Sequence, residues 1–402
     1  MSRILLAWEL GGGAGHLALL RPVAEALLAR GHQLTLAVRD IGSAALIFSG
    51  MEKQMQIVQA PICPKTYGGL ADPPLNFAEI LMRFGYLDVP MLKALLLGWR
   101  SLLELSGAER LIVDHAPTAL LAARGRVIAC STFGNPFSVP PPVSPTPNMR
   151  DWMDVPAQRL QDSDTRVVSA INAALAPDAP PISSLPQMFE VADHLFVGMP
   201  ELDPYGPRAS GNYVGLHTGR SGNEPALWPE GKGPRVFAYL KTSYPHIQRC
   251  LEALAAAPVR CLVNLAGATP QLTEHYRGPR LSFSTGHVDI DHALAQCDVL
   301  SCQSGLGTVS AALRGGKPLL LLPSQLEQFL LARNVEKLGV GIAIHPETPA
   351  PDFAGALTRI VTEPVFAENA RALAQRCSAT PVATIVDQIV ARIEARSTAL
   401  VA

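Results

Sequence analysis

Residues 297–341 constrain the fold more than any other part of the chain, because strand-like and helix-like segments alternate there at short intervals. A short apolar run at 298–302 is followed by a glycine-containing turn at 305–308 and by an apolar helical stretch at 309–314. A second apolar run, at 317–322, reads as a buried strand and stops at a proline. Strand, turn and helix in this order predict a parallel sheet covered by helices.

The turn at 305–308 predicts a site for an anionic group. Glycines at 305 and 307 let backbone N–H groups approach an anion closely, and the N-terminus of the following helix carries roughly half a positive charge. A diphosphate is the natural ligand for such a turn. Glu327 and Gln328 follow the second strand at its carboxyl end, where α/β sheets bind their ligands.

The segment resembles the nucleotide-sugar donor site of family-1, UDP-glycosyltransferase-like enzymes, a family that includes the bacterial natural-product and macrolide-type glycosyltransferases. The family pattern runs His-Gly-Gly-x-Gly-Thr, then Gly-x-Pro, then Pro with an acid–Gln pair, then Asn and Gly. Gln303 stands at the position of the family's diphosphate-contacting histidine, and Ser304 stands at its first glycine. A glutamine donates N–H bonds but carries no charge. The matching residues are Gly305, Gly307, Thr308, Gly316, Pro318, Pro323, Glu327, Gln328, Asn334 and Gly339.

The alternation of strands and helices along the chain predicts an α/β protein with two doubly wound, Rossmann-like domains, and the resemblance implies that they face a cleft as in the GT-B fold. We expect an acceptor-binding domain at 1–215, a Gly- and Pro-rich linker at 216–234, a donor-binding domain at 235–379 and a helix at 380–402 that crosses back to the first domain. The resemblance implies metal-independent, inverting transfer of a hexose. The donor would be a nucleoside-diphosphate sugar, UDP- or dTDP-linked, the acceptor a hydroxyl of a small or lipid-like molecule, and no cofactor is expected.

A second group of residues, Gly-Gly-Gly-Ala-Gly-His at 11–16, follows the first predicted strand. In the resembling enzymes a histidine of this turn is the general base, so the resemblance gives that role to His16, with Asp114 as the aspartate that orients it and Gly13 as a donor contact. An imidazole, with a pKa of about 6.5, is largely neutral at pH 7 and can accept an alcohol proton. A structural histidine is the alternative for His16, and His115 is a competing partner or base.

The resemblance implies further donor contacts. His287 and Val288 lie where related enzymes hold the nucleobase, and the Glu327–Gln328 pair would bind the sugar hydroxyls, unless Glu327 only favours the helix dipole. Lys241 follows the first strand of the second domain, where a lysine could restore the charge that Gln303 lacks. A merely solvated lysine is the alternative.

Composition excludes some classes of partner. The chain has 402 residues, 48% of them hydrophobic and 17% charged, with a formal net charge of −1. It has no run of Lys and Arg that would follow a phosphate backbone, so we expect no nucleic-acid partner. Seven dispersed cysteines without a CxxC pair read as reduced thiols, and the N-terminus enters a strand directly, so we expect a cytoplasmic protein. Contact with a membrane surface and the oligomeric state stay open.

Three other functions stay open on the sequence. Asp40, shortly after the predicted second strand at 33–38, keeps an NAD-dependent dehydrogenase possible, although the glycine spacing is not GxGxxG. The departures at Gln303 and Ser304 fit a non-catalytic GT-B accessory protein that serves another enzyme. A sugar-nucleotide epimerase-like enzyme would share the architecture.

Several elements can be placed for comparison with the structure. Helices are expected over 75–106, 157–175 and about 380–397, and a proline-rich loop over 132–147 follows a strand at 127–130. Apolar residues at helical spacing in the first of these predict core positions. They are Leu81, Phe84, Met91, Leu95 and Trp99.

Overall fold

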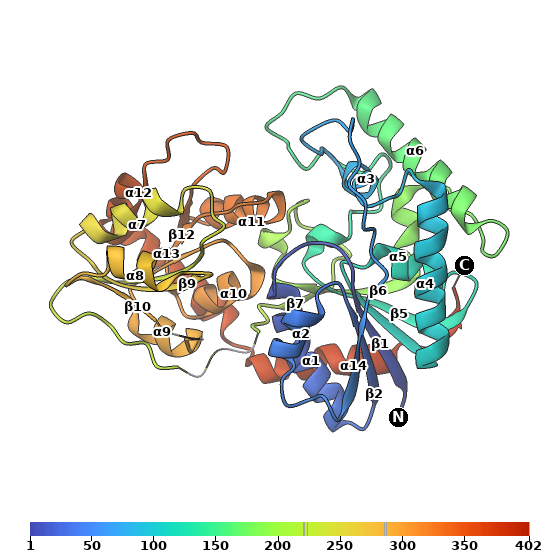
Figure 1. Cartoon of the computed structure of the whole chain (residues 1–402), viewed down its shortest axis with the longest axis horizontal. Coiled ribbons are helices and arrows are strands. Elements are labelled where there is room, and N and C mark those ends of the chain that lie inside the picture. Colours follow the sequence, from blue (N-terminus) through green and yellow to red (C-terminus); the bar gives the residue numbers. More distant parts are fainter. Residues whose placement is uncertain (220–221, 223, 285, 287, 402) are drawn as a thin grey trace. The chain divides into compact units, whose positions relative to one another are not determined.

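The computed structural model describes every residue except 220, 221, 223, 285, 287 and 402 (Figure 1). The chain divides into two compact units, each built on its own sheet. The N-terminal unit comprises residues 1–200, 205–214 and 386–402, and the C-terminal unit comprises residues 201–204 and 215–385.

The sheet of the N-terminal unit has the strand order β3-β2-β1-β4-β5-β6-β7, and β14 pairs antiparallel with β5. Strand β1 lies between β2 and β4 and is parallel to both, so the direction of winding reverses there. Trp8 pairs with Asp114, which brings the carboxyl ends of β1 and β4 side by side. The strands are β1 (Arg3–Trp8), β2 (Gln33–Val38), β3 (Met55–Gln59), β4 (Arg110–Asp114), β5 (Val127–Gly134), β6 (Ala192–Val197), β7 (Tyr213–Gly215) and β14 (Ala399–Leu400).

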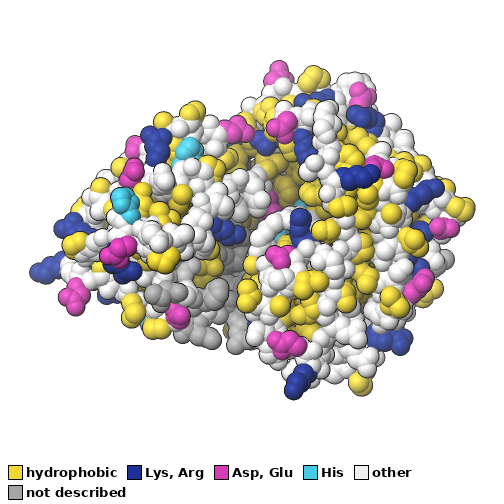
Figure 2. Space-filling model, in the orientation of Figure 1, with side chains coloured by type: hydrophobic (Ala, Val, Ile, Leu, Met, Phe, Trp, Pro, Cys, Tyr) yellow, Lys and Arg dark blue, Asp and Glu magenta, His cyan; other side chains and the backbone are white. Residues whose placement is uncertain are grey.

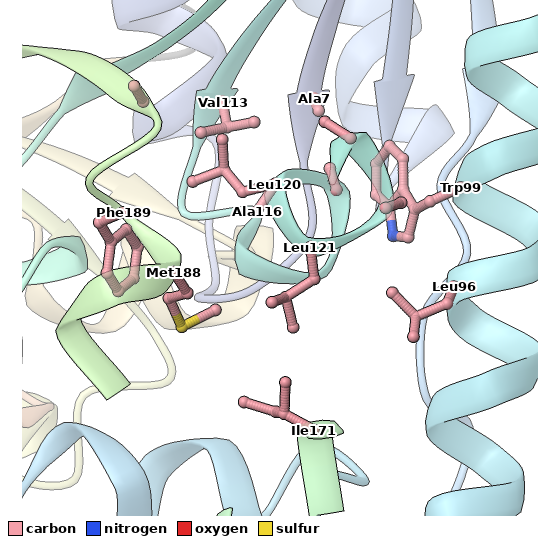
Figure 3. Packing of buried hydrophobic residues seen from close by; sticks show 14 of the residues in the cluster. Ala7, Leu96, Trp99, Val113, Ala116, Leu120, Leu121, Ile171, Met188 and Phe189 are labelled. Atoms are coloured by element: carbon pink, nitrogen blue, oxygen red, sulfur yellow. The ribbon is translucent and has the colours of Figure 1, made fainter. Parts of the chain in front are cut away.

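The core of the N-terminal unit forms where apolar helix faces meet the sheet. Figure 3 shows Leu96 and Trp99 of α4 near Leu121 of α5, with Ala7 of β1 and Val113 of β4 in the same buried cluster. The helices are α1 (Gly15–Ala29), α2 (Ile41–Ile47), α3 (Phe77–Met82), α4 (Val89–Ser106), α5 (Pro117–Ala123), α6 (Ala157–Leu175) and α14 (Val382–Ala395), with short 3-10 turns η1 (Pro136–Ser138) and η2 (Leu185–Met188). A third such turn, η3 (Pro200–Leu202), lies at the boundary of the two units.

Two predicted element boundaries in this unit are wrong. The expected single helix over 75–106 is two helices, because Gly85 adopts a left-handed φ of +90° and Asp88 starts α4 by accepting a hydrogen bond from the Met91 N–H. Strand β5 runs on to Gly134, into the expected loop, because its residues pair with β6 up to that glycine. Among the predicted core residues, Leu81, Leu95 and Trp99 are buried, whereas Phe84 and Met91 are half-buried.

The C-terminal helix α14 is attached to the N-terminal unit by polar contacts. Arg30, which directly follows α1, forms ion pairs with Asp387 and Glu394, so α1 and α14 lie side by side (Figure 1). Arg110 donates to main-chain carbonyl groups of Ile393, Glu394 and Arg396 at the end of α14. A cation at a helix C-terminus satisfies carbonyl groups that have no partner within the helix.

The sheet of the C-terminal unit has the order β10-β9-β8-β11-β12-β13, and all its pairings are parallel. Winding reverses at β8, which lies between β9 and β11. The strands are β8 (Arg235–Lys241), β9 (Arg260–Ala266), β10 (Leu281–Phe283), β11 (Val299–Cys302), β12 (Leu319–Leu321) and β13 (Gly341–Ala343), and the helices are α7 (Ile247–Ala256), α8 (Pro270–Tyr276), α9 (Ile290–Gln296), α10 (Leu306–Arg314), α11 (Leu326–Lys337), α12 (Phe353–Thr362) and α13 (Pro364–Cys377).

The visible surface carries charges of both signs. Figure 2 shows Lys and Arg side chains interspersed with Asp and Glu, without a broad area of one sign on this face. In the described part of the chain, no helix is both long enough and apolar enough to cross a membrane.

Candidate active site

His16 and Asp114 form a hydrogen-bonded pair in the N-terminal unit. His16 is the second residue of α1, and Asp114 is the last residue of β4. His16 Nδ1 lies 2.9 Å from Asp114 Oδ1, and the two side chains are 12% and 1% exposed. The topology brings His16 and Asp114 together, because α1 follows β1 and β4 is the strand next to β1 in the sheet. With an ionised carboxylate as acceptor, Nδ1 carries the proton, and Nε2 keeps the lone pair that a base needs.

Two glycines leave room for this pair. A Cβ atom on Gly11, whose φ is +82°, would lie 2.9 Å from His16 Nε2. A Cβ atom on Gly134, whose φ is +112°, would lie 2.8 Å from Asp114 Oδ1. Trp8 stacks on the His16 ring at a centroid distance of 5.4 Å. Gly134 was not predicted from the sequence, since this glycine comes close to Asp114 only through the pairing of β4 with β5.

His115, the competing residue, is buried beside the pair. Its φ is +49°, its ring centroid lies 6.3 Å from that of His16, and it packs against Phe77 and Phe137. Within the described part of the chain, neither ring nitrogen has a hydrogen-bond partner. Burial lowers the pKa of His115 to about 3, so the ring stays neutral. Asp114 contacts His16, which is also the more exposed histidine of the two.

Glu9 is a second buried carboxyl group near the pair, and it was not predicted from the sequence. Its two oxygens accept hydrogen bonds from the Thr118 backbone N–H and hydroxyl, at 3.0 and 2.5 Å, and Tyr86 contacts the same hydroxyl. Burial raises the pKa of Glu9 to about 8. Glu9 therefore ties the turn after β1 to α5. The feature of the sequence that could have indicated Glu9 is its position directly after the buried strand β1.

The rest of the first turn is held by its neighbours. Arg39 donates to the Gly11 carbonyl, and Gly13 adopts a left-handed φ of +82° just before α1.

Asp40, the residue that kept a dehydrogenase open on the sequence, accepts hydrogen bonds from the Ser43 N–H and hydroxyl and caps α2. Asp40 therefore acts as a helix cap in this structure.

In the C-terminal unit the predicted anion turn is partly helix. Helix α10 begins at Leu306 with Gly305 as its N-cap, so Gly307 and Thr308 lie in the first helical turn, which corrects the predicted start at 309. An N-cap glycine is compatible with this position because the helix needs no side chain there. The first N–H groups of α10 therefore follow directly after β11.

Gln303 and Ser304 lie between β11 and α10 and are buried, with 8% and 1% exposure. Among the described residues, Gln303 Nε2 and Ser304 Oγ have no hydrogen-bond partner. Ser304 also has a φ of +57°, a conformation that a glycine adopts more easily. Two unpartnered polar groups therefore lie at the N-terminus of α10.

The other predicted donor residues lie at the carboxyl ends of neighbouring strands. Glu327 and Gln328 occupy the first turn of α11, where the Ser324 N–H and hydroxyl donate to Gln328 Oε1. Val288 is buried and forms an isolated bridge with Glu224, and His287 lies outside the described residues. Lys241 is the last residue of β8 and is exposed.

Among the residues that the structure describes, no group of three or more His, Cys, Asp or Glu side chains is arranged to hold a metal ion.

Two doubly wound parallel sheets, each with candidate residues where its winding reverses, define the GT-B class. The comparisons with known proteins agree with this class. Residues 279–393 match the family profile described as "Erythromycin biosynthesis protein CIII-like, C-terminal domain". A PGL/p-HBAD biosynthesis rhamnosyltransferase of Mycobacterium bovis is 29% identical over 48% of this chain, and the matched part covers 43% of that relative. The chain thus matches less than half of the length of this relative.

Solved structures match the whole chain. The glycosyltransferase VinC in complex with dTDP superposes with a TM-score of 0.63 at 17% identity, covering 98% of this chain and 100% of that one. Spinosyn rhamnosyltransferase SpnG, complexed with spinosyn aglycone, gives a TM-score of 0.62 at 18% identity, covering 96% and 99%. The chain therefore has the GT-B fold, and its predicted resemblance to family-1, macrolide-type glycosyltransferases is confirmed.

Proposed function

We propose that this protein is an inverting glycosyltransferase that moves a sugar from a nucleoside-diphosphate sugar to an acceptor hydroxyl, with His16 as general base. The observation that carries the proposal is the contact of 2.9 Å between His16 Nδ1 and the buried Asp114 Oδ1. Named glycosyltransferases among the relatives support sugar transfer as the reaction.

In the proposed reaction His16 Nε2 takes the proton of the acceptor hydroxyl as the oxygen attacks the anomeric carbon of the sugar. The bond from that carbon to the diphosphate oxygen breaks on the opposite face, and the leaving group keeps the electron pair. Asp114 holds the imidazole in the required tautomer and stabilises the imidazolium that forms. Attack from the face opposite to the leaving group inverts the configuration.

The diphosphate would bind at the N-terminus of α10. The N–H groups of the first turn, together with Gln303 Nε2 and Ser304 Oγ, are donors that an anionic ligand can use. The same donors would stabilise charge on the leaving group as it develops. Glu327 and Gln328 would bind the sugar hydroxyls from the next loop.

The relatives support one choice of donor. VinC was solved with dTDP, which favours a dTDP-sugar over a UDP-sugar as the first donor to test. For the acceptor we propose a small or lipid-like alcohol, in line with the spinosyn aglycone bound to SpnG.

Replacing His16 tests the base assignment. We expect His16→Ala to lower the rate of nucleoside-diphosphate release from the sugar donor, with a panel of hydrophobic alcohols, by about 1000-fold. Nucleotide affinity should stay within twofold of the wild-type value, since His16 belongs to the other unit. The matched control is His275→Ala, which removes an exposed histidine of α8. Turnover of His16→Ala near the wild-type rate would disprove the assignment.

One alternative rests on a specific observation. Gln303 brings no charge to the diphosphate, which suits a non-catalytic GT-B accessory protein. Failure of the wild type to bind any nucleoside diphosphate would favour that alternative. Turnover of a sugar nucleotide without any acceptor would favour the epimerase-like alternative.

A further inference from the structure

The loops at the carboxyl ends of the strands in the C-terminal sheet contain no lysine or arginine. The loops that follow β8 to β13 span 242–246, 267–269, 284–289, 303–305, 322–325 and 344–352, and none contains a lysine or an arginine. Among the described residues of these strand ends and loops, Lys241, the last residue of β8, is therefore the one Lys or Arg.

Strand pairing brings Lys241 next to the N-terminus of α10. Strands β8 and β11 are parallel neighbours, and Tyr239 pairs with Cys302 at the end of their ladder. Lys241 lies two residues beyond Tyr239, and Ser304 lies two residues beyond Cys302. The crevice between diverging loops at such a reversal is where α/β sheets bind ligands. Lys241 thus follows the ladder of β8 and β11 at the same end of the sheet as Gln303 and Ser304.

The negative charges of a bound diphosphate would be stabilised by a positively charged side chain at this site. A nucleoside diphosphate carries at least two negative charges, whereas the donors at 303–305 are neutral amide, hydroxyl and backbone N–H groups. Gln303 Nε2 and Ser304 Oγ are buried and without partners in the described structure, so they are available to a ligand, but they cannot neutralise it. Hydrogen bonds from a charged donor are about twice as strong as neutral ones.

We propose that Lys241 supplies the positive charge for the donor diphosphate, from the strand next to the loop in which the resembling family has its diphosphate-contacting histidine. The inference rests on the proposed function and names the diphosphate counter-charge of that site. The inference implies that the positive charge can be supplied from residue 241 or from residue 303. A histidine at 303 should compensate for the loss of the lysine at 241.

The experiment is calorimetric titration of dTDP and UDP, and of the matching nucleosides, into wild type, Lys241→Ala and the double variant Lys241→Ala/Gln303→His. We expect Lys241→Ala to weaken diphosphate binding by about 10- to 100-fold and to leave nucleoside binding within twofold. The double variant should recover most of the lost affinity at pH 6, where a histidine is largely charged. Raising the salt concentration should weaken binding to wild type more than to Lys241→Ala.

The control is Lys232→Ala, which removes another exposed lysine of the same unit away from this edge and should change nothing. Diphosphate affinity of Lys241→Ala within twofold of wild type would overturn the inference while leaving the proposed function intact. An equal loss for nucleoside and diphosphate would also overturn it, since it would indicate a role other than charge. Absence of any nucleoside-diphosphate binding to wild type would overturn the proposed function and this inference together.

Discussion

At the scale of single residues, the histidine that we propose as base is defined by what surrounds it. Asp114 fixes one ring nitrogen, Trp8 stacks on the ring, and Gly11 leaves space beside the other nitrogen. Neighbouring His115 stays neutral, because burial lowers its pKa to about 3. It therefore adds no positive charge that would oppose protonation of His16.

A prediction at this scale concerns Gly134. In Gly134→Ala the new Cβ atom would meet Asp114 Oδ1 at 2.8 Å, and the φ of +112° is unfavourable for alanine. We expect the carboxylate to move and kcat/KM for sugar transfer to fall by about 100-fold. Steady-state kinetics measure the effect.

Gly50→Ala is the matched control, since Gly50 also has a left-handed φ, +87°, but no atom within 4 Å of the added carbon. It should cost stability without changing kcat/KM. Equal kinetics for Gly134→Ala and wild type would show that the position of Asp114 does not limit the reaction.

Only some of the residues of this site were predicted from the sequence. The resemblance led to His16 and Asp114, which the structure brings together across 98 residues of sequence. It did not lead to Glu9 or Gly134, because their contacts depend on strand pairing and on the docking of α5, which no local pattern encodes. Of the remaining candidates, His287 lies outside the described residues.

At the scale of elements, a buried acid joins the turn that carries His16 to α5. Glu9 accepts both of its hydrogen bonds from Thr118, the second residue of that helix. Burial raises the pKa of Glu9 from 4.5 to about 8, and the two hydrogen bonds oppose that rise. The folded protein therefore holds a proton that the unfolded chain releases between these two pH values.

This shift predicts a pH dependence of stability. Since the pKa is raised in the folded state, the contribution of Glu9 is fully present below about pH 4.5 and is lost as the pH rises through about 8. Wild-type stability should therefore fall across that window by a few kcal/mol from this group. Glu9→Gln, which mimics the protonated acid, should show a smaller decline in urea unfolding between about pH 6 and 9. The same decline in both proteins would contradict the assignment.

Elements were predicted well where the apolar pattern was continuous and poorly where a special backbone conformation decided the boundary. The strand at 33–38 and the helix at 157–175 occur as expected. The helix expected over 75–106 is divided, because left-handed Gly85 and the cap Asp88 together outweigh a nearly unbroken apolar periodicity. Helix α10 starts earlier than expected, since Gly305 serves as its cap rather than as part of a longer turn.

At the scale of the whole molecule, the two units repeat one arrangement. Each has a mainly parallel sheet whose winding reverses at its first strand, and each has its candidate residues at the carboxyl end of that strand and of a neighbour. Fold class was predictable from the alternation of strands and helices because that pattern is spread over the entire chain. Acceptor identity was not, since we expect it to depend on side chains from separate loops of the N-terminal unit.

The measurement that tests the central claim most directly is calorimetric binding of dTDP, UDP, GDP and NAD to the purified wild-type protein. We predict binding of dTDP or UDP with one site per chain, weakened by replacement of Thr308 or Gln328, and no binding of NAD. Binding of NAD alone, or of none of the four, would contradict the assignment of the α10 N-terminus as the donor site of a glycosyltransferase.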